Sequence, residues 1–265
     1  MTRCNPNSYK IMRNCKAASP AISMVIITAA TVVLVLIAGT FAAQLLDRQQ
    51  GSSEFETIQK SLVTFDDAVR DVAWDRGGSR SVRFTSNYGY ISLLPNEKTL
   101  QIEISEYDFA RTISTGVVKY SIPTSYVTQG EDYELYILGD GNAAVSSASE
   151  TSGQLVANQH GSSISYSLSY RVRVMTEGPS AFANYVDILV IKLDCASSTL
   201  VGDFDLIARN IGIKTDSSSP FPSGGSIATV NVALDGVQSK PVKVALDPSL
   251  PVVFNLITAE VRMTA

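Results

Sequence analysis

No charged side chain occurs between Ala17 and Leu46, and this apolar run restricts the possible folds more than any other feature. The polar residues inside it are Ser, Thr and Gln, which a membrane helix tolerates. About 20 apolar residues span a bilayer, so the run is long enough to cross one. Basic residues without any acid precede the run, whereas acids such as Asp47 and Glu54 soon follow it. This asymmetry predicts a cytoplasmic N-terminus and an external C-terminal body.

Two ordinary interpretations compete for the apolar run. A cleaved secretory signal would have an apolar region of about 7–15 residues, followed by a small-residue cleavage site. The run is about twice that length, which argues against simple cleavage after it. A single-span membrane anchor has the same topology, and topology alone leaves that interpretation open.

The residues at the start of the run separate these interpretations. A basic residue and two small residues are followed by Ser-Pro as the apolar stretch opens: Lys16, Ala17, Ala18, Ser19 and Pro20. Leader, junction and apolar run in this order resemble the class III signal of archaeal type IV pilins. The resemblance implies that a prepilin peptidase recognises these five residues and cuts between Ala17 and Ala18, so the apolar stretch stays on the mature protein. The chain departs from the pattern at Ala17, where many members have Gly, and at Ile22, where bacterial pilins have Glu.

The junction also suits the start of a helix. Ser19 is a favourable N-cap and Pro20 a favourable first helical residue, so Lys16 and Ala17 would remain in extended chain. Farther along the run, small residues stand four positions apart, a spacing that lets two helices approach closely. These candidate packing residues are Ala38, Gly39, Ala42 and Ala43.

Beyond the apolar run, hydrophobic residues recur three and four positions apart and predict an amphipathic helix that packs on the body. They are Phe55, Ile58, Leu62, Phe65, Val69 and Val72. The predicted polar side includes Glu56, Asp66 and Arg70. Gly77-Gly78 ends the pattern, and Gly51 can loosen its middle. Residues 20–76 therefore predict one long helix of roughly 85 Å, or two helices with a soft joint.

After Gly78 the hydrophobic period changes to two, which predicts roughly ten short strands. The expected strands are 81–85, 90–94, 100–105, 117–122, 133–138, 164–174, 186–193, 206–213, 228–234, 242–246 and 252–257. Turns are expected at 88–89 and 95–96, and surface loops at 142–153 and 217–225. Segment 186–193 is apolar on both faces and predicts a central strand. Because no helical pattern separates the strands, a sandwich or two packed sheets is expected.

The sequence offers little for catalysis or metal binding. His160 is the only histidine and Cys195 the only cysteine after the apolar run, so a zinc site would lack ligands. There is no phosphate-binding glycine loop and no Gly-x-Ser-x-Gly. The formal net charge is −4 although the first 17 residues carry four basic side chains and no acid, so the remainder carries −8. We therefore expect no enzyme activity, no cofactor, no metal and no nucleic-acid partner.

Together these patterns predict an α+β protein in which a long N-terminal helix packs on an all-β, sandwich-like C-terminal domain. We expect residues 1–17 to form a cytoplasmic leader. Residues 18–76 would form a pilin-like helix with an apolar half at 20–46 and an amphipathic half at 54–73. Residues 79–265 would form an extracellular β domain.

The resemblance implies a structural subunit of an extracellular type IV pilus-like filament, which starts in the cell membrane and assembles through its apolar helix. Its implied partners are copies of itself or other pilins, the prepilin peptidase and the pilus assembly machinery. The alternative is a single-span surface protein, such as a minor pilin or an adhesin, whose β domain binds a ligand or partner. A hydrolase anchored outside the cell has no residues in its favour.

Overall fold

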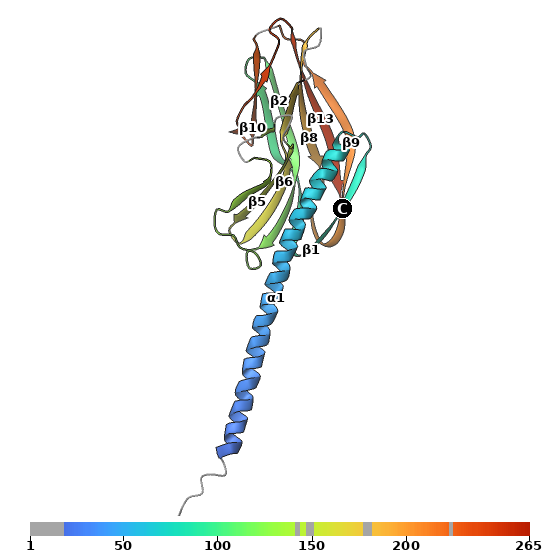
Figure 1. Cartoon of the computed structure of the whole chain (residues 1–265). Coiled ribbons are helices and arrows are strands. Elements are labelled where there is room, and N and C mark those ends of the chain that lie inside the picture. Colours follow the sequence, from blue (N-terminus) through green and yellow to red (C-terminus); the bar gives the residue numbers. More distant parts are fainter. Residues whose placement is uncertain (1–18, 141–143, 147–150, 177–181, 223–224) are drawn as a thin grey trace, which may run out of the picture. The chain divides into compact units, whose positions relative to one another are not determined.

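The chain folds into one long N-terminal helix and a β-rich C-terminal body (Figure 1). The computed structural model describes residues 19–140, 144–146, 151–176, 182–222 and 225–265. Backbone contacts divide the chain into two units, residues 1–47 and residues 48–265. The second unit holds the C-terminal part of the helix together with the strands, which confirms the predicted α+β combination of a helix packed on a mostly β body.

Helix α1 (Ser19–Ala73) is continuous. The predicted soft joint at Gly51 lies within the helix, and Gly51 is buried. A Cβ atom at this position would lie 2.8 Å from Cβ of Tyr126, so glycine allows α1 to approach that side chain closely. After Ala73 the chain turns through Gly77, which has a φ of 79°, a conformation that favours glycine after a helix.

The strands of the body are β1 (Ser79–Ile104), β2 (Phe109–Pro123), β3 (Glu134–Leu138), β4 (Val145–Ser146), β5 (Gly153–His160), β6 (Ser163–Tyr170), β7 (Val172–Thr176), β8 (Asn184–Asp194), β9 (Ser198–Ser217), β10 (Ile227–Leu234), β11 (Val237–Gln238), β12 (Val242–Ala245) and β13 (Val252–Thr264). In the described residues they join into one hydrogen-bonded sheet with the order β3-β5-β6-β2-β1-β9-β13-β8-β7-β4, and β10 branches from β1 to reach β11 and β12. This pairing does not show the two separate sheets of a sandwich. Strand β8 lies between β13 and β7, as its two apolar faces predict.

The sequence predicts three short strands joined by turns where the structure has the single strand β1. It runs unbroken for 26 residues, and the expected turns are irregularities within it. The register against β9 shifts between Ser86 and Ile91, and the register against β2 shifts between Leu94 and Lys98. Asn96 takes a φ of 52° in the second irregularity. Turn-prone residues are thus accommodated as bulges, which bend a strand without ending it.

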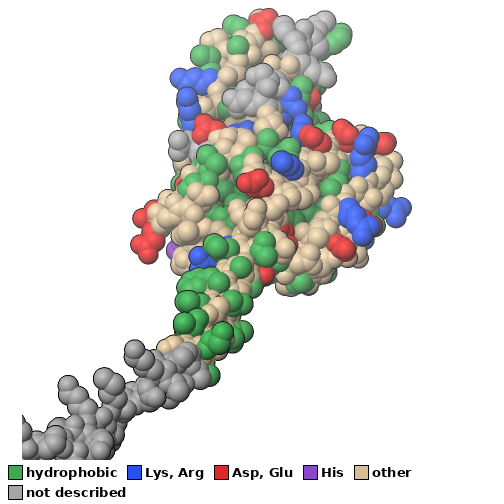
Figure 2. All heavy atoms as spheres, turned by 60° about the horizontal axis from the view of Figure 1, so that its bottom comes forward, with side chains coloured by type: hydrophobic (Ala, Val, Ile, Leu, Met, Phe, Trp, Pro, Cys, Tyr) green, Lys and Arg blue, Asp and Glu red, His purple; other side chains and the backbone are tan. Residues whose placement is uncertain are grey.

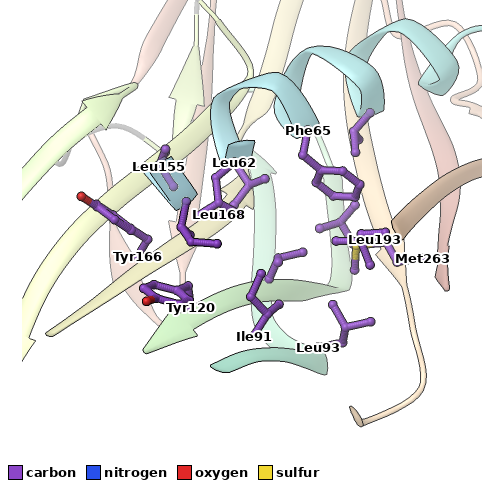
Figure 3. Packing of buried hydrophobic residues seen from close by; sticks show 14 of the residues in the cluster. Leu62, Phe65, Ile91, Leu93, Tyr120, Leu155, Tyr166, Leu168, Leu193 and Met263 are labelled. Carbon is purple, nitrogen blue, oxygen red and sulfur yellow. The ribbon is translucent and has the colours of Figure 1, made fainter. Parts of the chain in front are cut away.

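Two hydrophobic clusters form the interior of the body. The first joins the buried stripe of α1 to residues of the strands around it, including Ile91, Tyr120, Leu168 and Met263 (Figure 3). The second unites residues of β1, β2, β10 and β12 with residues of β7, β8 and β13. The amphipathic half of α1 is therefore part of the main core of the body.

Candidate assembly site

The apolar half of α1 exposes its large side chains. Fourteen large hydrophobic residues between Ile22 and Leu46 are exposed, among them Leu36 at 65% and Phe41 at 63%. Figure 2 shows hydrophobic side chains covering the described part of this segment. Single exposed hydrophobic residues are ordinary on a protein surface, but a contiguous apolar patch of this extent marks contact with a membrane or another protein.

The threonine hydroxyl groups of this segment are bonded within the helix. Thr28 Oγ1 donates to the Met24 carbonyl oxygen at 3.0 Å, and Thr31 Oγ1 donates to that of Ile27 at 2.6 Å. Thr40 Oγ1 makes the same kind of bond, so these polar groups need no water. An apolar surrounding requires this, because unbonded polar groups are costly there. By length and composition, α1 could cross a membrane.

The small residues of the apolar half leave open space beside the helix. Ala38, Gly39, Ala42 and Ala43 are all exposed. A Cβ atom at Gly39 would meet no atom of this chain within 4 Å, apart from the backbone of its own helix. These positions therefore let the helix of another chain approach closely.

The predicted cleavage junction falls mainly outside the described residues. Lys16, Ala17 and Ala18 lie there, whereas the backbone of Ser19 and Pro20 forms the first residues of α1.

The residues expected to join helix and body lie in the main core. Phe55 and Val72 are 6% and 3% exposed, and the others of the stripe are fully buried: Ile58, Leu62, Phe65 and Val69. The Phe55 ring stacks on Tyr166 with 4.2 Å between centroids. Full burial of such side chains stabilises the folded state by about 1.5–3 kcal/mol each, so this stripe is a strong link between the helix and the sheet.

Glu54 forms a polar link at the start of this stripe, which the sequence pattern did not single out. Its carboxylate accepts backbone N–H bonds from Asn87 at 2.7 Å, from Tyr88 at 3.1 Å and from Gly89 at 3.1 Å. It also accepts the hydroxyl of Tyr120 at 2.8 Å. One helical side chain thus holds both the bulge of β1 and a buried tyrosine of β2. Burial and this carboxylate raise the pKa of Tyr120 far above its usual range, so its hydroxyl remains a donor.

The prediction that Asp66 lies on the polar side of the helix is wrong. Its side chain is fully buried and pairs with Arg70 Nε at 2.9 Å. The carboxylate fills the space above Gly153 in β5, where a Cβ atom would lie 2.7 Å from Asp66 Cγ. Burial raises the pKa of Asp66, and the nearby Arg70 opposes this increase. Tyr170 is also buried, and its pKa is raised well above the usual value by burial and by this carboxylate.

The described residues offer no cluster suited to metal binding. Within them, no group of three His, Cys, Asp or Glu side chains could hold a metal ion. His160 is exposed at the end of β5. Burial raises the pKa of the Cys195 thiol, which disfavours the reactive thiolate.

Comparison with protein-family models, curated protein sequences and solved structures finds no match for this chain.

Proposed function

We propose that this protein is a structural subunit of an extracellular filament, assembled in the manner of archaeal type IV pilins. The observation that supports the proposal most is the division of α1. Its first half exposes an uncharged apolar surface, and its second half belongs to the main core of a β-rich body. A filament subunit needs both halves of the helix, because the first half must pack against other copies while the second half carries the body.

The apolar half must leave water in any functional state. Fourteen large side chains are exposed along it, and burial of each contributes about 1.5–3 kcal/mol. Because the helix already covers about a third to a half of each side chain, the summed driving force is of the order of 10–25 kcal/mol, which makes lipid or other protein chains its only stable surroundings. In the proposed sequence of events lipid surrounds the precursor, and copies of the same helix replace the lipid in the filament.

The small residues around Gly39 favour protein neighbours over lipid. Lipid chains adapt to any apolar surface, whereas packed helices gain most where small side chains let their backbones approach. We propose that the junction at Ala17 and Ala18 is cut by a prepilin peptidase, as the resemblance implies, and that the body faces outward from the filament.

The proposal is tested by shearing cells that make the full-length protein and imaging the released material by electron microscopy with a specific antibody. We expect labelled filaments in the sheared fraction. Protein that remains wholly in the membrane fraction, with no labelled filament, would support the single-span surface protein instead.

A further inference from the structure

An open cavity of about 880 Å³ lies beside the turn that follows α1. Its wall is formed by that turn and by strands β9 and β13, and it includes Arg76, Arg209 and Arg262. Among the described residues, no Asp or Glu lines it. Arg262 Nε pairs with Asp194 at 2.9 Å, whereas Arg76 and Arg209 form no ion pair with any described residue. In a body whose net charge is negative, this cavity concentrates unused positive charge.

The buried Asn210 places the turn that carries Arg76 beside strand β9. Its Nδ2 donates to the carbonyl oxygens of Val72 at 3.1 Å and Ala73 at 2.6 Å, and its backbone N–H donates to Gly78 at 3.0 Å. These bonds fasten the turn after α1, which carries Arg76, to strand β9. Asn210 also lines the cavity, and its Oδ1 accepts no hydrogen bond from a described residue. The accessible polar groups of the wall therefore include the guanidinium donors of the arginines, because the Asn210 Oδ1 is buried behind its surface.

The cavity also has an apolar part, which indicates what it can hold. Ile207 and Ile211 line it, and Ile211 is 41% exposed. Guanidinium groups bind carboxylates in a planar, often bidentate arrangement. The lining contains no aromatic side chain on which nucleic-acid bases could stack. A segment that carries carboxylates beside an aliphatic side chain fits this chemistry best.

Such a segment lies at one end of the sheet, in the residues that precede and open strand β3. Glu131, Asp132 and Glu134 are exposed, and none forms an ion pair within the described residues. Leu135 beside them is 49% exposed. Glu134 Oε1 accepts the hydroxyl of Tyr136 at 2.6 Å, which orients its carboxylate. We call residues 131–135 the acidic strip.

The acidic strip and the cavity belong to different sides of the body. Strand β3 is the last strand at one end of the order, and β5, β6, β2 and β1 separate it from β9. Figure 1 shows β5, the partner of β3, on the opposite side of the body from β9. A contact between two different surfaces of identical chains is head-to-tail, and such contacts produce open helical assemblies when the rotation between copies does not close a ring.

We propose that the acidic strip of one copy docks in the arginine cavity of the next copy along the filament. The inference rests on the proposed function and adds a specific contact between bodies to the packing of apolar helices. Arg76 and Arg209 bind the carboxylates of the strip, while Ile207 and Ile211 cover Leu135. Charge pairing of this kind also sets the register in which subunits join.

The test reverses each charged surface in the full-length protein. The cavity variant carries Arg76→Glu with Arg209→Glu, and the strip variant carries Glu131→Arg with Glu134→Arg. We expect each variant to lower the yield of sheared filaments at least about tenfold, and the combined variant to restore most of it. A control with Arg83→Glu and Lys240→Glu has the same charge change outside the cavity and should assemble normally.

A steric variant and a cross-link complete the test. A Cβ atom at Gly212 would meet nothing within 4 Å, so Gly212→Leu should fold normally while it fills the cavity and reduces assembly. In a background in which Cys4, Cys15 and Cys195 are replaced by Ser, Arg209→Cys combined with Glu134→Cys should give multimers with a short bismaleimide, and neither single variant should do so.

Two results would overturn the contact. One is normal assembly of both reversed variants. The other is a combined variant that assembles as poorly as the cavity variant and the strip variant, provided that thermal unfolding shows all three to be folded. A wild-type protein that forms no filament at all would instead remove the proposed function, and the contact with it.

Discussion

Replacing Glu54 with alanine removes the carboxylate that fastens the amphipathic half of α1 to the sheet. Four donors lose their acceptor, namely the backbone N–H groups of Asn87, Tyr88 and Gly89 and the hydroxyl of Tyr120. The change leaves the hydrophobic stripe of the helix intact. It therefore measures the polar part of the link separately from the apolar part.

The magnitude follows from which of these donors water can reach. Asn87 is exposed and Tyr88 is half-buried, so water replaces the carboxylate there at little cost. Tyr120 is fully buried and Gly89 is buried, and an unsatisfied donor costs about 1–3 kcal/mol in such a position. We expect Glu54→Ala to lower the free energy of unfolding by about 2–6 kcal/mol, and Glu54→Gln by less because one acceptor oxygen remains.

The assay is denaturant unfolding of the full-length protein in detergent micelles, followed by near-ultraviolet circular dichroism. Glu56→Ala is the matched control, since Glu56 is exposed two positions along the helix and has no hydrogen-bond partner among the described residues. Its effect should stay within about 0.5 kcal/mol. If Glu54→Ala destabilised the protein no more than this control, Glu54 would not be a structural link.

Three further predictions concern other contacts of the helix. Gly153→Ala should lower the free energy of unfolding, measured with denaturant, by about 1–3 kcal/mol because its Cβ atom would overlap the Asp66 carboxylate. Gly212→Ala is the control and should be nearly neutral, since open space surrounds that position. Equal losses of stability in the two variants would contradict the prediction. Because the pKa of Asp66 is raised on folding, its contribution to stability should fall as the pH rises from the ordinary aspartate range through the folded pKa. The free energy of unfolding of Asp66→Asn should therefore increase relative to that of the wild type as the pH rises through this range. A difference that stays constant with pH would contradict the raised pKa. Gly39→Leu should insert into membranes as well as the wild type but give few sheared filaments, and an undiminished filament yield would exclude close helix packing at this position.

The helix could be predicted from sequence because its signals are local. The spacing of Phe55, Ile58 and Leu62 selects one face of a helix, and the absence of charge from Ala17 to Leu46 selects an apolar surrounding. Both depend only on residues near in the chain. The same holds for the change of period after Gly78, which marks the β body.

The features that could not be predicted depend on partners distant in the chain. Asp66 follows Phe65 directly and looks like a polar-side residue, but Gly153 and Arg70 provide a buried place for it. Glu54 meets donors more than 30 residues away. The glycine and proline of β1 indicate turns in isolation, whereas pairing on both sides keeps that strand continuous with bulges.

The arginine cavity illustrates the same limit. Arg76 and Arg209 are far apart in sequence, and neither belongs to a basic run. They come together because Asn210 binds the last carbonyl groups of α1 and thereby places the following turn beside β9. Sequence periodicity carries no information about such a tertiary helix cap.

The central claim is that this protein leaves the membrane and becomes part of a filament after its leader is removed. Mass spectrometry of subunits from purified, sheared filaments tests both parts in one measurement. We predict that the filaments contain this chain with Ala18 as its first residue. Filaments without the chain, or a chain that is found only in membranes and still begins at Met1 or Thr2, would contradict the claim.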